Sequence, residues 1–312
     1  MGNCLEVLQG SHTTVENNVR NRRLSTTIDI NDDLALVDSK PGDCAVVTRA
    51  GIEDRRIKIN QDAFFLDKER FLYAVFDGHG KFGHLCSQYF RTHLPVAFEA
   101  VKENLSPENI SSALLQVADA LDLDDSIDTK FSGLVATVCC VQEERIISAW
   151  VGDSRAILRS AHSTVALTTD HKPEVLAERK RILRAGGKVK QLKDTDGTPL
   201  GGLRVFVPSS TIPGVNFTRS FGDAVIHKYG VCSVVECIVK PRLPEDKFIV
   251  VASDGVFEML SNQEVSSLVA SSSTVAEAAE KLVHSSHQKW LNVEHGCADD
   301  ITSIVIYVGM AG

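Results

Sequence analysis

Short apolar runs alternate along this chain with stretches of helical periodicity. Residues 71–77 (FLYAVFD), 248–255 (FIVVASDG) and 301–308 (ITSIVIYV) are β-rich apolar runs, which predict strands. Between residues 136 and 160, the runs ATVCCV, IISAWVG and AILRS predict consecutive antiparallel strands joined by short turns. Residues 85–101 instead place apolar side chains at helical spacing, so we expect an amphipathic helix there.

Capping signals mark the start of further helices. Ser106 followed by a proline is typical of a helix N-terminus, and the segments 261–264 (SNQE) and 274–277 (TVAE) both match the capping box. A helix predicted over 173–185 stops at the Gly-Gly pair that follows it. Since no internal repeat is present, these elements predict one α+β domain in which helices cover antiparallel sheets.

The N-terminal segment differs from the rest. Residues 1–40 are polar and lack a sustained period, so we expect a flexible tail, or a segment ordered only by docking on the single domain over 41–312. Its first four residues, Met-Gly-Asn-Cys, offer Gly2 for myristoylation and Cys4 for palmitoylation. Glu6 stands where the simple pattern favours Ser or Thr, so peripheral membrane contact and an unmodified terminus both stay open.

Composition restricts the class of protein. The chain of 312 residues is 43% hydrophobic and 24% charged, as in soluble globular proteins. Its formal net charge of -8 argues against a nucleic-acid partner. The eight cysteines form no C-x-x-C pair and are typical of a reduced, cytoplasmic protein. No secretory signal and no apolar run near about 18 residues is present, and we expect a monomer.

Aspartates stand at the ends of apolar runs. These are Asp62, Asp77, Asp153, Asp254 and the pair Asp299 and Asp300. Each could be a simple turn residue, but several buried carboxylates gathered at one sheet edge would repel one another. Divalent cations remove that repulsion, and carboxylate oxygen is the ligand that Mg²⁺ and Mn²⁺ prefer. The pattern therefore predicts a magnesium or manganese site.

Seven segments follow one another along the chain: NQDAFF, FDGHGKFG, WVGDSRAIL, TTDHKP, TRSFGD, ASDGVFEML and DDITSIV. Taken in this order, they resemble the metal-dependent protein phosphatase family of type 2C, and the resemblance covers about residues 43–308. It implies a β-sandwich of two antiparallel sheets flanked by helices, with a two-metal centre in a cleft between the sheets. It also implies hydrolysis of phosphoserine and phosphothreonine in phosphorylated protein substrates.

The resemblance assigns the metal ligands by motif. Asp77 is expected to bridge two ions, Asp254 and Asp299 to complete the shell of the first, and the Gly78 carbonyl to bind the second. Asp153 together with Asp254 matches the position of a weaker third ion.

The expected chemistry requires no protein nucleophile. Two divalent ions lower the pKa of a water molecule held between them and neutralise charge on the phosphoryl oxygens. The leaving serine or threonine oxygen needs a proton, and His79 in DGHG is the candidate donor. The alternative is a histidine that only hydrogen-bonds an aspartate.

Several positions depart from the family. Gln61 replaces the acid beside Asp62, which is then expected to hold water or to orient its neighbour. Ile57 replaces the phosphate-binding arginine. Arg56 is the first candidate for that role, because arginine is the better phosphate fork, and Lys58 is the second; the alternative is a solvated basic run.

Other departures leave room for a weak enzyme. Val135 replaces a hydroxyl near the metals, and Asp300 stands where many members have asparagine. An inactive phosphatase-fold module that binds phosphoprotein partners is therefore the alternative function. Residues 175–218 resemble the variable flap beside the cleft.

A cysteine phosphatase is a further alternative, since Cys139 and Arg145 have C-x5-R spacing. Such a loop must supply glycines and free amides that cradle phosphate, whereas this one contains Val-Gln-Glu-Glu. We therefore interpret the segment as a strand and a turn.

Overall fold

Two antiparallel sheets pack face to face in the computed structural model, which describes residues 27–30, 32–37, 43–161, 163–208 and 214–309. The first sheet has the order β1 (Thr27–Ile30), β2 (Asp32–Val37), β3 (Cys44–Arg49), β18 (Ile301–Tyr307), β17 (Asp246–Ala252), β10 (Arg155–Ser160) and β11 (Thr164–Ala166). The second has the order β16 (Glu236–Pro241), β9 (Arg145–Val151), β8 (Gly133–Val141), β7 (Leu72–His79) and β6 (Asp62–Asp67), and β15 (Phe221–Gly222) pairs with β8.

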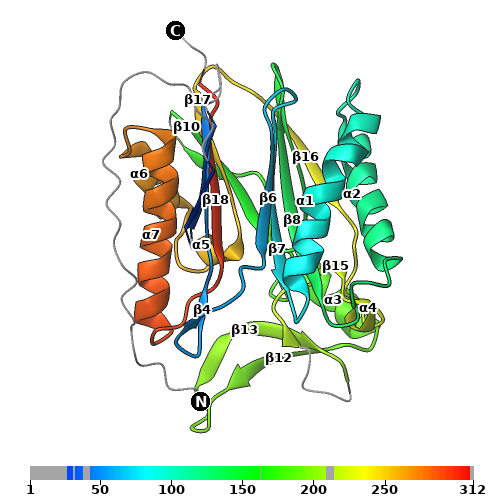
Figure 1. Ribbon diagram of the computed structural model, residues 1–312. Coiled ribbons are helices and arrows are strands. Elements are labelled where there is room, and N and C mark those ends of the chain that lie inside the picture. The colour runs from blue at the N-terminus through cyan, green and yellow to red at the C-terminus, as the bar shows by residue number, and fades with distance from the viewer. Residues whose placement is uncertain (1–26, 31, 38–42, 162, 209–213, 310–312) are drawn as a thin grey trace.

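Helices cover the outer faces of both sheets (Figure 1). On the second sheet lie α1 (Gly83–Ala100) and α2 (Pro107–Asp122), with the short α4 (Ala224–His227) near them. On the first lie α6 (Asn262–Ala270) and α7 (Val275–Val293), and α5 (Asp254–Phe257) follows β17. Separate apolar clusters fill the space under each helical layer and between the sheets. The predicted α+β sandwich is therefore confirmed.

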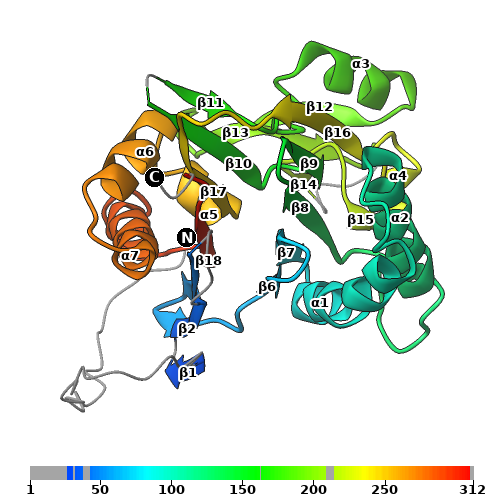
Figure 2. The ribbon, with the colours of Figure 1, turned by 90° about the horizontal axis from the view of Figure 1, so that it is seen from above.

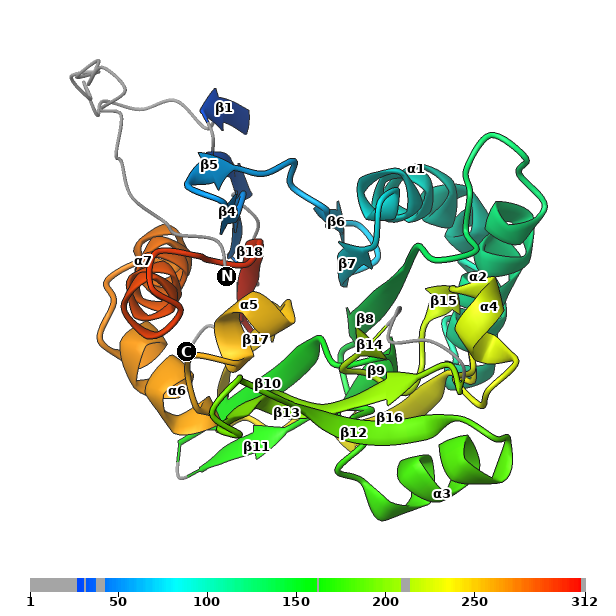
Figure 3. The same ribbon diagram turned by 90° about the horizontal axis from the view of Figure 1, so that it is seen from below.

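Two small hairpins lie at one end of the sandwich (Figures 1 and 3). The hairpin of β4 (Ile52–Glu53) and β5 (Arg56–Ile57) follows β3. The other joins β12 (Lys188–Lys193) and β13 (Pro199–Phe206), with β14 (Gly214–Val215) paired to β13. This second hairpin follows α3 (Leu176–Arg184), and together they form the segment that the sequence identifies as a flap.

The predicted elements are largely present. Ser106 caps α2 by accepting a hydrogen bond from Asn109, and Ser261 forms the complete capping box with Glu264. Thr274 accepts a hydrogen bond from Glu277, whose carboxylate accepts from the backbone of the residue before the cap. The helix predicted from residue 173 begins at Leu176, because turn hydrogen bonds occupy the backbone just before it.

One expectation about strand pairing was wrong. The strands β9 and β10 do not pair: β9 belongs to the second sheet and β10 to the first, so the chain crosses between the sheets at residues 152–154. Residues 27–30 and 32–37 form the two strands β1 and β2, which extend the first sheet beside β3 (Figure 2). Of the two alternatives expected for residues 1–40, docking on the domain is the one that agrees with this pairing.

Candidate metal centre

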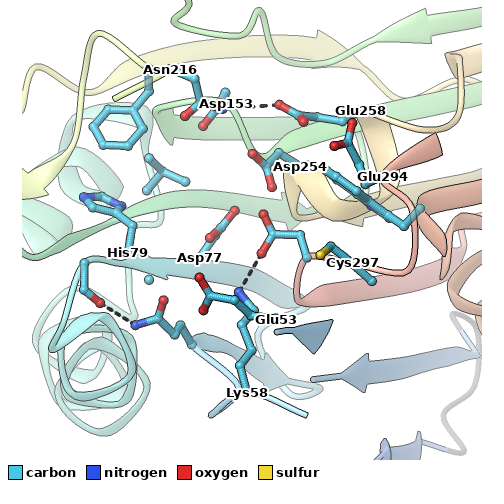
Figure 4. Close-up of a pocket in the computed structure, with 18 of the residues that line it drawn as sticks. Glu53, Lys58, Asp77, His79, Asp153, Asn216, Asp254, Glu258, Glu294 and Cys297 are labelled. Carbon is cyan, nitrogen blue, oxygen red and sulfur yellow. Dashed lines mark hydrogen bonds and ion pairs between the residues drawn. The ribbon is translucent and has the colours of Figure 1, made fainter. Parts of the chain in front are cut away.

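A cavity of about 660 Å³ opens between the two sheets, at the end where β7 stops. Asp77, Gly78 and His79 reach it from the end of β7 in the second sheet. Asp254 reaches it from the start of α5 and Asp299 from the residues before β18, both next to the first sheet. Carboxylates that are far apart in the sequence thus meet in one space (Figure 4).

The crossing between the sheets brings in a further acid. Asp153 lies in the turn between β9 and β10, is buried and lines the cavity. Gly152, just before it, has φ +103, and a Cβ there would lie 2.2 Å from the Val135 side chain. Only glycine accepts both conditions without strain. The close contact between Gly152 and Val135 therefore fixes where Asp153 enters the cavity.

The acids are close enough to disturb one another. Burial raises the pKa of Asp77 well above its ordinary value, and the charges of Asp254 and Asp62 raise it further. Burial and the charge of Asp153 raise the pKa of Asp254 in the same way. Carboxylates with such raised pKa values are poorly compensated when ionised, and a hard divalent ion such as Mg²⁺ or Mn²⁺ would compensate them. The residues present therefore fit divalent metal ions.

One acid of this group was missed by the sequence analysis. Ligand oxygens of Asp153, Asp254 and Glu258 all lie within 4.8 Å of one another. Glu258 lies four residues after Asp254, so both fall on the same side of one helical turn. That spacing within ASDGVFEML was the signal that could have identified Glu258.

Two lysines already form ion pairs with the acids. Lys58 Nζ lies 2.7 Å from Asp299 Oδ1 and 2.9 Å from Asp300 Oδ2. Lys172, from the DHKP segment, lies 3.2 Å from Asp153 Oδ2 and also contacts Glu258. Burial opposes the charge of both lysines, but these neighbouring carboxylates raise their pKa values overall. Both lysines at the cavity are therefore already paired with carboxylates of the same site.

Asp62 lies beside the cavity but does not line it. It is buried, stands opposite Asp77 in the pairing of β6 with β7, and accepts a hydrogen bond from Ser253 Oγ at 2.8 Å. Burial, with the charge of Asp300, raises its pKa to about 7. This placement suits a residue that orients its neighbours better than a direct metal ligand.

The expectation that Arg56 contacts substrate phosphate is not met by its placement. Arg56 and Ile57 form the exposed strand β5 of the small hairpin, and neither lines the cavity. Lys58, the second candidate, does line it. Arg56 directly follows the tight β4–β5 turn, in which Asp54 and Arg55 both have positive φ, and so it lies on the exposed hairpin.

His79 lies at the rim of the cavity in a defined hydrogen-bond network. Its Nε2 is 2.5 Å from Asp223 Oδ2, and Ser220 Oγ donates to the same carboxylate oxygen at 2.7 Å. The ring of Phe217 packs against the imidazole at a centroid distance of 4.4 Å. Sequence reasoning missed Asp223, although it ends the TRSFGD segment. The imidazole is thus held in place by a buried carboxylate.

Gly78 and Val135 shape the space around Asp77. A Cβ at Gly78 would lie 2.2 Å from the Gly83 carbonyl oxygen and 2.6 Å from that of Gln61, so only glycine fits. Val135 stands opposite Asp77 in the pairing of β7 with β8 and lines the cavity. An apolar group therefore occupies the position where the family resemblance places a hydroxyl.

The cysteine-phosphatase alternative does not fit the structure. Cys139 is buried in β8, and burial raises the pKa of its thiol to about 12. Arg145 begins β9 across a tight turn and donates to Gln142 Oε1 at 2.6 Å. A buried thiol of this kind cannot form the thiolate that a nucleophile requires, so the strand-and-turn interpretation holds.

The described helices include none that is both long and apolar enough to cross a membrane. Gly2 and Cys4, the predicted acylation sites, lie outside the described residues. The seven cysteines in the described part of the chain form no disulfide with one another.

Comparisons with known proteins agree with the geometry. A family model described as protein phosphatase 2C matches residues 19–289. The chain is 32% identical to probable protein phosphatase 2C 34 of Arabidopsis thaliana, over 89% of this chain and 82% of that one. A solved serine-threonine phosphatase 2C from Toxoplasma gondii has a TM-score of 0.71 and 19% identity, and the match covers 88% of this chain and 98% of that one. A structure of the catalytic domain of the phosphatase PstP with two manganese ions has a TM-score of 0.56 and 15% identity, over 86% and 99% of the two chains.

Proposed function

Because this chain belongs to the protein phosphatase 2C family and is a metal-dependent protein serine/threonine phosphatase, we propose that hydrolysis takes place in the cavity between its two sheets. The observation that carries this proposal is the convergence of Asp77, Asp153 and Asp254 from three separate elements (Figure 4). Phosphorylated proteins are the substrates, and Mg²⁺ or Mn²⁺ is the cofactor.

Most of these acids would be direct metal ligands, and Asp62 would support them. Asp77, Gly78, Asp254 and Asp299 would hold two metal ions, and Asp153 with Glu258 would complete a weaker third position, which Lys172 now neutralises. When bound, such ions activate a water molecule and neutralise charge on the phosphoryl oxygens. Asp62 would act indirectly. Its carboxylate accepts a hydrogen bond from Ser253, the residue that precedes Asp254.

His79 supplies the proton that the leaving oxygen of serine or threonine requires. Asp223 holds the imidazole in position at the rim of the cavity through the contact with its Nε2. Of the two basic residues predicted to contact substrate phosphate, only Lys58 lines the cavity. The proposal therefore keeps Lys58 and gives up Arg56.

Hydrolysis of a phosphothreonine peptide tests this assignment. Wild type is expected to require Mn²⁺ or Mg²⁺ and to lose activity in EDTA, and Asp77→Asn should lower kcat about a hundredfold or more. The control is Asp125→Asn, which removes an exposed carboxylate far from the cavity in sequence. Full activity of Asp77→Asn would overturn the proposal.

The segment Met-Gly-Asn-Cys supports a finer proposal, that myristate on Gly2 and palmitate on Cys4 bring the enzyme to a membrane. One chain would bind only weakly, and two would anchor stably. Mass spectrometry of the protein from its own cells should find both groups, and an unmodified Gly2 would contradict the proposal. We further propose that the enzyme is a monomer, which light scattering after gel filtration would test.

A further inference from the structure

The flap carries a charge opposite to that of the whole chain. Residues 175–218 contain eight Lys and Arg against three Asp and Glu, whereas the full chain contains 33 against 41. Lys188, Lys190 and Lys193 on β12 are all exposed. The flap lies below the open end of the sandwich in Figure 1, at the end of the molecule where the cavity opens. A basic surface therefore stands next to an acidic cavity.

Two of these cations stand directly opposite each other. Lys190 on β12 pairs in register with Arg204 on β13. Directly opposite residues of antiparallel strands share one face. The neighbouring pair, Val189 and Val205, packs into the apolar cluster on the other face. Lys190 and Arg204 therefore point away from that core, and Arg204 lines the catalytic cavity.

Neither cation is neutralised within the described part of the chain. Arg204 Nη1 donates to the Gly214 carbonyl at 2.8 Å, and no carboxylate pairs with Arg204 or Lys190 there. By contrast, Lys58 and His79, the other basic residues of the cavity lining, each contact an aspartate. Like charges directly opposite each other on paired strands destabilise the folded state. An anion bound between Lys190 and Arg204 would reduce their repulsion.

We propose that Lys190 and Arg204 bind an acidic side chain of the substrate next to its phosphorylated residue. This inference rests on the proposed placement of hydrolysis in the cavity. Arg204 belongs to the cavity lining, but Lys190 is exposed and does not. An anion held by both therefore lies at the rim, outside the group of metal-binding acids. The enzyme accordingly favours phosphoproteins in which aspartate or glutamate flanks the phosphoserine or phosphothreonine.

Three substrates test the proposal. They are a phosphothreonine peptide with Asp and Glu flanks, the same peptide with Asn and Gln flanks, and p-nitrophenyl phosphate, which has no flanks. Arg204→Gln should raise KM for the acidic peptide about fivefold or more and leave the other two unchanged. Lys190→Gln keeps the Arg204–Gly214 hydrogen bond and should give a smaller rise of the same kind. Lys180→Gln, which removes an exposed cation of α3 in the same flap, is the matched control and should change none of the three.

An equal rise in KM for all three substrates would overturn the proposal, because the guanidinium would then contact the phosphoryl group itself. Unchanged kinetics of both variants, or an equal effect of Lys180→Gln, would also overturn it. Absence of metal-dependent activity of wild type toward every substrate would instead contradict the proposed site of hydrolysis. Higher salt should reduce the preference of wild type for the acidic peptide, since the contact is exposed.

Discussion

At the scale of the residue, the orientation of the His79 ring depends on its contact with Asp223. The 2.5 Å contact of its Nε2 with Asp223 fixes one ring nitrogen, and Phe217 limits how the ring can turn. Asp223 itself has φ 53, in the left-handed region. Backbone strain of this kind at a non-glycine residue persists only where the surroundings stabilise it. The hydrogen bonds from Ser220 and His79 provide that support.

Leaving-group dependence should reveal the role of His79. His79→Ala is expected to lower kcat on a phosphothreonine peptide about a hundredfold, because the alkoxide leaving group needs a proton. Hydrolysis of p-nitrophenyl phosphate should change little, since nitrophenolate leaves without one. Asp223→Asn should show the same selectivity to a smaller extent. Equal losses on both substrates would indicate a role in metal or phosphate binding instead.

The pKa of Asp62 predicts a specific dependence of stability on pH in the metal-free protein. Its folded pKa of about 7, against an ordinary value of 3.8, means that the folded state binds the extra proton. Its contribution to stability therefore falls as pH rises from about 4 to about 7. Burial lowers the pKa of both His171 and His287 to about 4, so these residues act in the opposite direction over the same range. The comparison must therefore be made between variants.

Asp62→Asn isolates this contribution. In EDTA, the free energy of unfolding of the variant relative to that of wild type should increase as pH rises from 4 to 7. The expected increase in this difference is on the order of 3 kcal/mol. Urea denaturation at several pH values measures the difference, and Asp125→Asn serves as the exposed control. A constant difference across this range would show that Asp62 is ionised normally in the folded protein.

At the scale of the element, the helix starts and buried strands were predictable because their signals are local. Ser106, Ser261 and Thr274 each cap the helix that the sequence assigns to them. Which sheet a strand joins is not a local property. The runs of β9 and β10 look alike in hydrophobic pattern, but β9 pairs with β8 and β16, whereas β10 pairs with β17 and β11 in the other sheet.

The attachment of α3 to the body depends on one buried carboxylate. Glu178 accepts hydrogen bonds from Arg219 Nη2 at 2.7 Å, Arg181 Nη2 at 2.7 Å and Thr218 Oγ1 at 2.6 Å. Burial alone would raise the pKa of Glu178, but these hydrogen bonds lower it far below its usual range. Glu178 therefore stays ionised and ties the flap to the segment that precedes β15.

Glu178→Gln should loosen the flap. Breaking one partner of a buried ion pair costs about 3 kcal/mol, and we expect that cost to appear first as faster amide exchange over residues 188–206. Activity on p-nitrophenyl phosphate should be retained, because the metal-binding acids lie on other elements. Glu280→Gln, which changes an exposed residue of α7, is the control. Unchanged exchange in the flap would show that other contacts hold α3.

At the scale of the whole molecule, the sequence predicted those site residues that belong to recognisable motifs in a fixed order. The acids at strand ends do meet in one cavity, as the DGHG, GDSR and SDG segments together predict. Asp223 was missed because its importance comes from His79, a neighbour that only the fold supplies, whereas the spacing of Glu258 from Asp254 was a local signal that the sequence-based prediction did not use. Arg56 was chosen over Lys58 because the sequence does not show that Arg56 lies on an exposed hairpin strand outside the cavity lining.

The acids that we propose as metal ligands come from both sheets, so metal binding should stabilise the sandwich as a whole. Asp77 ends a strand of the second sheet, whereas Asp254 and Asp299 flank strands of the first. Ions held by these residues would connect the sheets and compensate the carboxylates whose pKa values burial and neighbouring charges raise, Asp77 and Asp254. At a free Mn²⁺ concentration of 100 times Kd, one such site adds about 2.7 kcal/mol to the free energy of unfolding.

Asp77→Asn should separate these two effects. In EDTA at pH 7 the variant should unfold at a higher temperature than wild type, because one of the repelling carboxylates is gone. On addition of Mn²⁺ wild type should gain stability and overtake the variant, whose own gain should be small. Thermal denaturation over a series of Mn²⁺ concentrations measures both quantities, with Asp125→Asn expected to follow wild type throughout. An equal Mn²⁺ shift in wild type and Asp77→Asn would mean that the ions bind elsewhere, and that the two sheets are not joined through this cavity.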